Sequence, residues 1–409
     1  MPSTLPDGEP VPLDGALPVA ALQQLNLRPF GIYVHVPFCA ARCGYCDFNT
    51  YTAEELGTGP DAVSRASYPD TAMEELRLAR HMLGARAPRV ATVFFGGGTP
   101  TLLPAGHLST VLREIDDLFG LAPDAEVTTE ANPESVTPAY LARLRQAGFT
   151  RISLGMQSAR PHVLAVLDRR HTPGRAVQAV AEAKRAGFGH INLDLIYGTP
   201  GESEADWQAS LDAAIDTGPD HVSAYSLIVE EGTALARRIS RGELPPPDDD
   251  LLADRYTQAD ETLTRSGYAW YEVSNWARGL AARSRHNRLY WTGGDWWGVG
   301  PGAHSHVGGV RWWNVRHPAQ YAARLHAGLS PAQAREVLGE RSRRLERLLL
   351  GLRLREGLSL GELSSGGQDA ASRAVTYGLL ERQAHGDGRA VLTLRGRLLA
   401  DAVVRDLAD

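Results

Sequence analysis

The chain contains three cysteines, and all of them fall within one short stretch: Cys39, Cys43 and Cys46. An odd number of clustered cysteines in the spacing CxxxCxxC argues against a disulfide framework and favours a metal centre. Thiolates are soft ligands that hold zinc or an iron–sulfur cluster. Because a [4Fe–4S] cluster usually has four cysteine ligands, three would leave one iron open to a substrate or cofactor. A structural Cys3His zinc site, completed by His35 or another histidine, is the alternative.

A glycine-rich segment stands one predicted strand further along the chain. Residues 96–100 read Gly-Gly-Gly-Thr-Pro. Three glycines leave backbone N–H groups unshielded, so that a ligand can approach the main chain closely. A tight turn that needs positive φ is the structural alternative. The segment has neither the Lys-Ser/Thr of a phosphate-binding loop nor the spacing of a dinucleotide fingerprint.

Four polar residues elsewhere could contact the same ligand. Glu130, Gln157 and Asp194 can each hydrogen-bond an amine or a ribose hydroxyl, and Arg169 can bind a carboxylate through its planar fork. Each of them alone is more commonly a cap or a member of a packing network. Their shared position at the ends of predicted strands is what suggests a site.

The elements that must position these residues are six apolar strands that alternate with helices. The strands are predicted at residues 31–36, 90–95, 126–130, 151–156, 191–196 and 221–227, and the helices near 71–83, 105–119, 137–148, 172–187 and 203–218. The alternation predicts an α/β fold of right-handed βαβ units, a partial (β/α)6 barrel. In such barrels the chemistry lies at the carboxyl ends of the strands. The cysteines, the glycines and three of the polar residues all follow or end these strands, so we expect one shared site.

Four segments are predicted along the chain. They are an irregular leader at 1–29, the barrel at 30–230, a flanking region rich in Trp, His and Gly at 231–330, and a small α-rich unit at 331–409. A further strand is expected at 268–273. In the last unit, a helix at 341–355 is expected to bury one stripe of leucines, and residues 389–394 could form a hairpin. The stripe consists of Leu345, Leu348, Leu349 and Leu352.

Composition excludes several classes of protein. The chain has 409 residues and a formal net charge of −6, which gives no basic footprint for nucleic acid. It contains no run of 18 apolar residues that could span a membrane. The first residues lack the pattern of a secretory signal, and three unpaired cysteines suit a reducing compartment, so a cytoplasmic location is expected.

These motifs resemble those of radical S-adenosylmethionine (SAM) enzymes. More closely, residues 30 to 400 resemble the family of oxygen-independent coproporphyrinogen III dehydrogenase and its haem-chaperone relatives. The resemblance implies that the three cysteines bind a [4Fe–4S] cluster whose open iron takes the amino and carboxylate groups of SAM. Reduction then cleaves SAM to methionine and a 5′-deoxyadenosyl radical. By the same resemblance, Tyr33, Tyr45, Gly97 and Glu130 surround that SAM. Five positions match those that hold a second SAM in the dehydrogenase: Gly98, Thr99, Gln157, Arg169 and Asp194.

Three features favour the haem-chaperone branch. The dehydrogenase carries another cysteine just past the cluster motif, where this chain has Phe48, and it has a longer N-terminal region. Residues 286–291, His-Asn-Arg-Leu-Tyr-Trp, resemble the HNxxYW motif that the chaperone branch links to haem. A neutral imidazole is a good axial ligand for haem iron, which makes His286 a candidate ligand; a hydrogen-bonded loop histidine is the alternative. Four further residues are candidate neighbours of that haem: His304, His306, Trp312 and Trp313.

We therefore expect a cluster- and SAM-binding haem chaperone that hands haem to acceptor proteins, respiratory enzymes being candidates. Oxidative decarboxylation of the two propionates of coproporphyrinogen III is the alternative activity. The sequence leaves open whether one or two SAM molecules bind, whether SAM is cleaved productively, and whether the chain forms a homodimer.

Overall fold

The computed structural model describes residues 8–57, 63–169 and 172–408. In this part of the chain, twelve strands form one sheet in the order β12-β11-β10-β9-β1-β2-β3-β4-β5-β6-β8-β7. The six predicted strands are its centre, and each pairs in parallel with the next. They are β1 Phe30–Val36, β2 Val90–Gly97, β3 Leu121–Ala131, β4 Arg151–Gln157, β5 His190–Tyr197 and β6 His221–Ser226.

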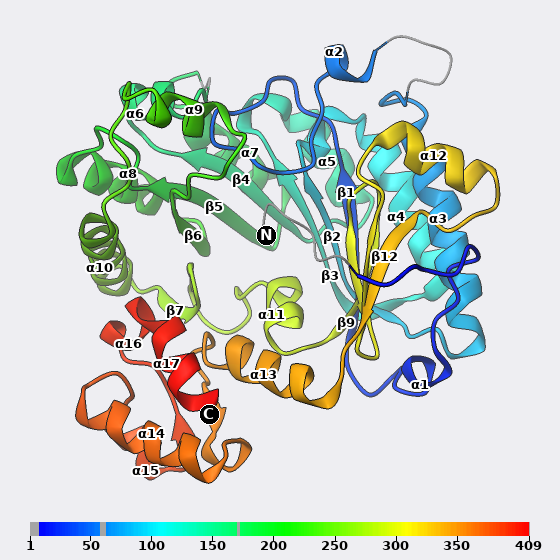
Figure 1. Ribbon diagram of the computed structural model, residues 1–409. Helices are drawn as coiled ribbons and strands as arrows, with labels where there is room; N and C mark the ends of the chain where they lie inside the picture. Colours follow the sequence, from blue (N-terminus) through cyan, green and yellow to red (C-terminus); the bar gives the residue numbers. More distant parts are fainter. Residues whose placement is uncertain (1–7, 58–62, 170–171, 409) are drawn as a thin grey trace.

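Helices connect the parallel strands, and Figure 1 shows them along the outer face of the sheet. They are α3 Tyr68–Leu83, α4 Ala105–Phe119, α5 Pro138–Gln146, α6 Pro161–Val166, α7 Arg175–Ala186 and α8 Glu204–Asp216. The barrel is open, because β1 pairs on its other side with β9 (Asp295–Val299) and β6 with β8 (Asn275–Ala277). The predicted partial (β/α)6 barrel is therefore confirmed.

The helix boundaries follow local side-chain chemistry. Thr137 and Ser203, the residues at which these helices were predicted to begin, are the N-caps of α5 and α8, and each accepts a hydrogen bond from a backbone N–H of the first turn. The helix expected from residue 172 begins later, at Arg175, behind Gly174 in the left-handed conformation. Its buried residues are Ala176, Ala179, Val180 and Ala183. Val177 is 44% exposed, although it is apolar, because it lies one helical position outside this stripe.

Strands from the flanking region extend the sheet at both edges. On the β1 side these are β9, β10 (His304–Val307), β11 (Val310–Asn314) and β12 (Ala332–Val337). On the β6 side, β8 is followed by β7 (Ala269–Glu272), which confirms the strand expected at 268–273. The N-terminal segment contains the short helix α1 (Val19–Leu22), and the main chain of Glu9 pairs with Arg335 of β12.

The C-terminal helices enclose a hydrophobic core of their own, built from residues 348–407. Figure 1 shows this unit below the barrel, with α13 (Glu340–Gly351), α14 (Ser365–Thr376), α15 (Arg382–Gly386), α16 (Leu394–Leu398) and α17 (Ala400–Ala408). The predicted leucine stripe of α13 is half wrong. Leu348 and Leu352 are buried, whereas Leu345 and Leu349 are 47% and 39% exposed, because the helix buries one narrow side only.

The hairpin expected at 389–394 is also wrong. β14 (Arg389–Ala390) pairs in antiparallel fashion with the distant β13 (Leu358–Ser359) instead of with the residues that follow it. A two-residue strand has little local signal, so its partner is decided by the helices that bring residues 358 and 390 together. The boundaries of the four predicted segments stay predictions.

Candidate functional site

The strand register brings the predicted site residues to one rim of the sheet. His35 and Val36 of β1 stand beside Gly96 and Gly97 of β2, and Asp194 of β5 stands beside Gly155 of β4. The cysteine loop follows β1, the glycine segment ends β2, Glu130 lies near the end of β3 and Gln157 ends β4. Parallel strands end at the same edge, so residues far apart in sequence meet here.

The cysteine loop runs between β1 and the short helix α2 (Ala53–Leu56). Its three thiols are free and half-buried. Burial, with a smaller contribution from the neighbouring Cys39 and Cys43 thiols, raises the pKa of Cys46 to about 11, so the three side chains lie near one another. A metal that binds here must displace the thiol protons.

The chemistry of these thiols bears on the choice of metal centre. The described residues contain no group of three His, Cys, Asp or Glu side chains placed to hold a metal ion. Three thiols in one loop are soft ligands, a donor set that suits a [4Fe–4S] cluster with one open iron. A zinc ion held by the same thiols and a histidine is the alternative.

Residues outside the motif hold the cysteine loop in place. Asn49 donates from Nδ2 to the carbonyls of Pro301 and Arg316 at 2.9 and 2.8 Å, which ties the loop to the strands beside β1. The Asn49 carbonyl lies 2.8 Å from Nε2 of His35, at the end of β1. A carbonyl only accepts, so Nε2 carries the proton and Nδ1 accepts from the Tyr33 hydroxyl at 3.1 Å.

The glycine segment packs tightly against this loop. Gly97 has φ +108°, and a Cβ on it would lie 2.6 Å from the His35 ring. A Cβ on Gly98 would lie 2.5 Å from the carbonyl oxygen of Phe38. The glycines are therefore required by close approach as well as by backbone conformation.

The expectation that this segment leaves its N–H groups unshielded is wrong for three of them. The N–H of Gly97 donates to Oε2 of Glu130 at 3.1 Å. Those of Gly98 and Thr99 each donate at 2.8 Å to carbonyls of residues 36 and 38, beside the cysteines. The segment thus couples three neighbouring strand ends to one another.

Two largely buried carboxylates, Glu130 and Asp194, lie at the rim. Burial raises the pKa of Glu130 to about 8, with the nearby Asp194 adding to the shift and the Gly97 N–H opposing it. Burial also raises the pKa of Asp194, although Ser153 and Asn192 hydrogen-bond its two oxygens at 2.6 and 2.8 Å. Paired buried carboxylates favour a ligand that brings positive charge or several hydrogen-bond donors.

The remaining site residues come from β4 and the loop after α6. Arg169 donates from Nη1 to the Cys43 sulfur and from Nη2 to the Gly155 carbonyl, both at 3.3 Å. Gln157 has φ +66° at a bulge that ends the pairing of β4 with β5. A non-glycine residue held at positive φ next to a bulge is a feature that clusters at functional sites. Tyr45 lies beside Arg169, and burial raises its pKa.

A cavity of about 1440 Å³ opens beside the cysteines. Its walls come from the cysteine loop, α6, α7 and α9 (Ala234–Ser240). Apolar side chains such as Met156, Leu164 and Val177 alternate there with Arg42 and Arg237. Typical small-molecule sites occupy about 300–1000 Å³, so this space can take more than one ligand.

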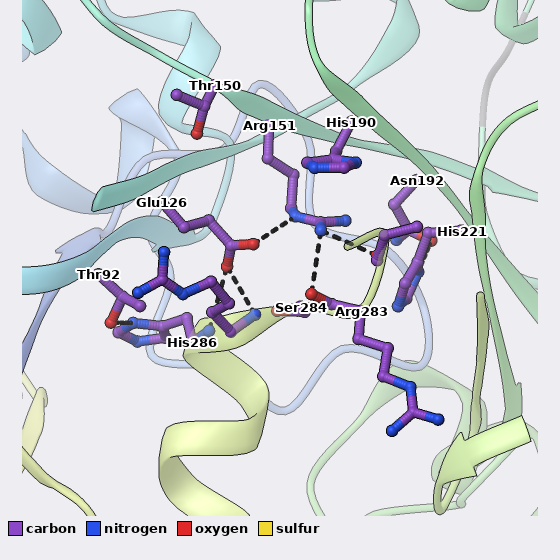
Figure 2. A network of polar contacts seen from close by, with 12 residues as sticks. Thr92, Glu126, Thr150, Arg151, His190, Asn192, His221, Arg283, Ser284 and His286 are labelled. Atoms are coloured by element: carbon purple, nitrogen blue, oxygen red, sulfur yellow. Dashed lines mark hydrogen bonds and ion pairs between the residues drawn. The ribbon is translucent and has the colours of Figure 1, made fainter. Parts of the chain in front are cut away.

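The HNxxYW segment forms α11 (Arg285–Trp291) on the inner face of the sheet. His286 is 1% exposed, and its Nδ1 lies 2.8 Å from the Thr92 hydroxyl (Figure 2). Its Nε2 lies 2.8 Å from the Tyr290 hydroxyl. Both ring nitrogens are therefore occupied within the protein. The predicted haem neighbours are packed in β10 and β11, where His304 stacks on Trp313 and His306 bonds the Gly294 carbonyl.

Comparison with known proteins identifies the family. The Radical SAM superfamily profile matches residues 33–214. The protein named "Heme chaperone HemW" from Mycobacterium tuberculosis H37Rv is 54% identical over 400 residues, which cover 97% of this chain and 98% of that protein. The chain belongs to the HemW family of radical SAM proteins.

Other relatives agree with this placement. The protein of the same name from Escherichia coli K12 is 36% identical over 69% of this chain and 71% of its own length. The solved structure of coproporphyrinogen III oxidase (HemN) from Escherichia coli superposes with a TM-score of 0.79 at 22% identity, over 97% of this chain and 94% of that one. At that identity the likeness to HemN establishes the fold.

The helices of the chain also bear on a membrane location. Among the described residues, none of them combines the length and the apolar composition that a membrane-spanning helix needs, as the sequence predicted.

The sequence did not predict the residues that hold the cysteine loop, Gly97 and Tyr33 in place. Asn49 fastens the cysteine loop, His35 bridges that loop to Gly97, and Phe94 packs against Tyr33. A signal was present, because alternate residues of a strand share one face. Tyr33 and His35 on β1 therefore had to point to the same side.

Proposed function

We propose that the chain is a haem chaperone, which binds haem, a [4Fe–4S] cluster and SAM and transfers haem to acceptor proteins. The observation that carries the proposal is the 54% identity with "Heme chaperone HemW" along nearly the whole of both chains. Three free thiols in a reducing compartment suit a cytoplasmic protein. The HemN-like fold supports oxidation of coproporphyrinogen III as the second candidate.

The cluster and SAM are assigned to the rim of the barrel. Cys39, Cys43 and Cys46 would hold the cluster, which when bound and reduced supplies the electron that cleaves SAM. Tyr33, Tyr45, Gly97 and Glu130 would surround this SAM. A second SAM would contact Gly98, Thr99, Gln157, Arg169 and Asp194. The charge of the rim supports this, because the positively charged sulfonium group of SAM would stabilise the ionised forms of Glu130 and Asp194.

Haem is assigned to the cavity beside the cysteines. Haem is a flat apolar ring with two carboxylates at one edge. The cavity offers apolar side chains for the ring, and Arg42 and Arg237 for the carboxylates. The motif-based prediction that His286 ligates the iron would need one of its two hydrogen bonds to break and that buried nitrogen to become accessible, which makes the cavity the better location for the ring.

Two assays on protein with an anaerobically reconstituted cluster test this proposal. Addition of haem should give a Soret band of bound haem, and the haem should then pass to haem-free myoglobin. Incubation with SAM, a reductant and coproporphyrinogen III should yield no protoporphyrinogen IX. Absence of a bound Soret band, or turnover of the porphyrinogen, would contradict the chaperone function.

Paired variants test the location. Arg237→Ala removes a cavity cation and should weaken haem binding by roughly tenfold, the effect of about 1.4 kcal/mol from one charge-assisted hydrogen bond. Arg265→Ala is the matched control, because Arg265 is 69% exposed on the separate helix α10 (Asp249–Arg265). Equal haem affinity in both variants would place haem elsewhere.

A further inference from the structure

The helix of the HNxxYW segment is fixed at its N-terminus by a buried ion pair. Oε1 of Glu126 accepts the N–H groups of Arg285 and His286 at 2.9 and 3.1 Å. Oε2 of the same carboxylate accepts from Nε of Arg151 at 2.9 Å. Arg151 also donates to the carbonyls of Ala282 and Arg283, which precede the helix (Figure 2). These contacts hold α11 against the inner face of β3 and β4.

The His286 ring is held in one orientation by this placement. Thr92 of β2 and Tyr290 of α11 bond its two nitrogens, and the ring stacks on Phe94 with centroids 5.1 Å apart and an angle of 27° between planes. Burial lowers the pKa of His286 to about 3, so the imidazole is neutral. One nitrogen donates and the other accepts, and neither faces solvent.

The stack continues from His286 to the rim. Phe94 stacks on Tyr33, with centroids 6.2 Å apart and an angle of 28°. The Tyr33 hydroxyl donates to Nδ1 of His35, whose Nε2 donates to the carbonyl of Asn49 in the cysteine loop. The His35 ring also fills the space beneath Gly97. His286 is therefore joined through three side chains to both the cysteine loop and the glycine segment.

The carboxylate of the rim adjoins the same stack. A Cβ placed on Gly96 would lie 2.9 Å from Phe94, 3.1 Å from Tyr33 and 3.2 Å from Oε2 of Glu130. Burial raises the pKa of the Tyr290 hydroxyl, and the nearby Glu130 charge adds to that shift. The aromatic stack and the carboxylate assigned to SAM thus share one packed space.

We propose that His286 is a positioning residue for the SAM site, holding Phe94 and Tyr33 beneath the cysteine loop and Gly97, and that it is not the ligand of the haem iron. This inference rests on the proposed function for the identity of the two ligands. It assigns the histidine of the HNxxYW motif to SAM binding instead of to haem. The effect of the ring is mechanical, because Ala at this position removes the stacking partner of Phe94 and leaves two buried hydroxyls unpaired.

The test compares SAM and haem binding in the same cluster-containing variants. His286→Ala should raise the Kd for SAM by about threefold to tenfold, the range that an aromatic contact supports, and weaken the change that SAM produces in the EPR spectrum of the reduced cluster. His286→Gln keeps a polar group near Tyr290 and should recover part of the SAM affinity. Both variants should show the Soret band of the parent protein when haem is bound. His326→Ala is the matched control, because His326 is 62% exposed on α12 (Pro318–His326).

Two outcomes would overturn the proposal. One is a shifted or lost Soret band in His286→Gln, which would make His286 a ligand of the iron. The other is an unchanged Kd for SAM in His286→Ala. If His286→Ala does not fold, Tyr290→Phe removes only the partner of Nε2 and should still raise the Kd for SAM. Failure of the parent protein to bind haem would refute the proposed function, but the SAM measurements would still decide the role of His286.

Discussion

Removal of the Glu126 carboxylate should destabilise the protein more than any surface charge change. Glu126 and Arg151 are 4% and 2% exposed, and Glu126 accepts three hydrogen bonds, one from Arg151 and two from the first turn of α11. Breaking one partner of a buried pair costs about 3–5 kcal/mol, because it leaves the other charge uncompensated. Total stabilities are typically about 5–15 kcal/mol, so Glu126→Ala should lose a large fraction of the free energy of unfolding.

The expected losses of free energy of unfolding in the Arg151 and double variants depend on which buried polar groups each variant leaves unpaired. Arg151→Met should cost about 3 kcal/mol, since the Glu126 carboxylate keeps its two backbone donors. Nη1 of Arg151 has no hydrogen-bond partner among the described residues, so the pair is not fully satisfied. The double variant Glu126→Leu/Arg151→Met should therefore cost less than the sum of the single changes, by roughly 1–3 kcal/mol of coupling.

Urea denaturation of the cluster-free protein, followed by tryptophan fluorescence, measures these free energies. The control is Arg77→Ala, which breaks an ion pair with Glu114 in which Arg77 is 56% exposed and which should change stability by about 0–1 kcal/mol. A loss below about 1 kcal/mol in Glu126→Ala, or strict additivity in the double variant, would refute the reasoning that the pair anchors α11.

Three further predictions concern pH, backbone and cluster. Burial raises the pKa of Glu75 to about 7 from its ordinary 4.5, so its contribution to stability is present below pH 4.5 and is lost as the pH rises through 7. Glu75→Gln should flatten the fall in stability between pH 5 and 7 by up to about 1.4 kcal/mol per pH unit, measured by urea denaturation across that range; an unchanged slope would contradict it. Gly97→Ala should abolish SAM binding in equilibrium dialysis, because the added Cβ would clash with His35. The control is Gly106→Ala in α4, where the added Cβ meets open space and the change should be neutral or stabilise the protein by about 0.5–1 kcal/mol. Equal SAM affinity in the two variants would contradict this. Cys43→Ala should lower the iron content of reconstituted protein from about four per chain toward zero, and retention of four irons would remove Cys43 from the cluster.

The sequence alone determined the arrangement of strands and the shared rim. Apolar strands that alternate with capped helices leave few topologies, and parallel strands bring their carboxyl ends to one edge. Cys39, Gly97 and Glu130 could therefore be assigned to one site from their positions along the chain. The caps Thr137 and Ser203 were equally legible, because a cap depends on residues within one turn.

What the sequence left undecided depended on contacts between distant segments. Leu345 and Leu349 of α13 share the periodicity of buried leucines, yet the described part of the chain leaves them 47% and 39% exposed. No local pattern reveals how wide a face of a helix its neighbours bury. The N–H groups of the glycine segment were expected to face a ligand, but Glu130 and the cysteine loop accept them. Such partners lie on other strands, so they become known only when the strands are in register.

His286 shows most clearly what the sequence determines and what only the tertiary structure decides. Its motif predicted a histidine near a ligand, and chemistry alone made haem iron a reasonable partner. The helix brings Tyr290, four residues further on, to one nitrogen, but only the tertiary structure placed Thr92 on the other nitrogen and Phe94 against the ring. A side chain can coordinate a metal only through a nitrogen that the fold leaves accessible. The sequence therefore determined which chemical roles were open to a histidine at this position. The packing of α11 against the sheet decided which of these roles His286 can perform.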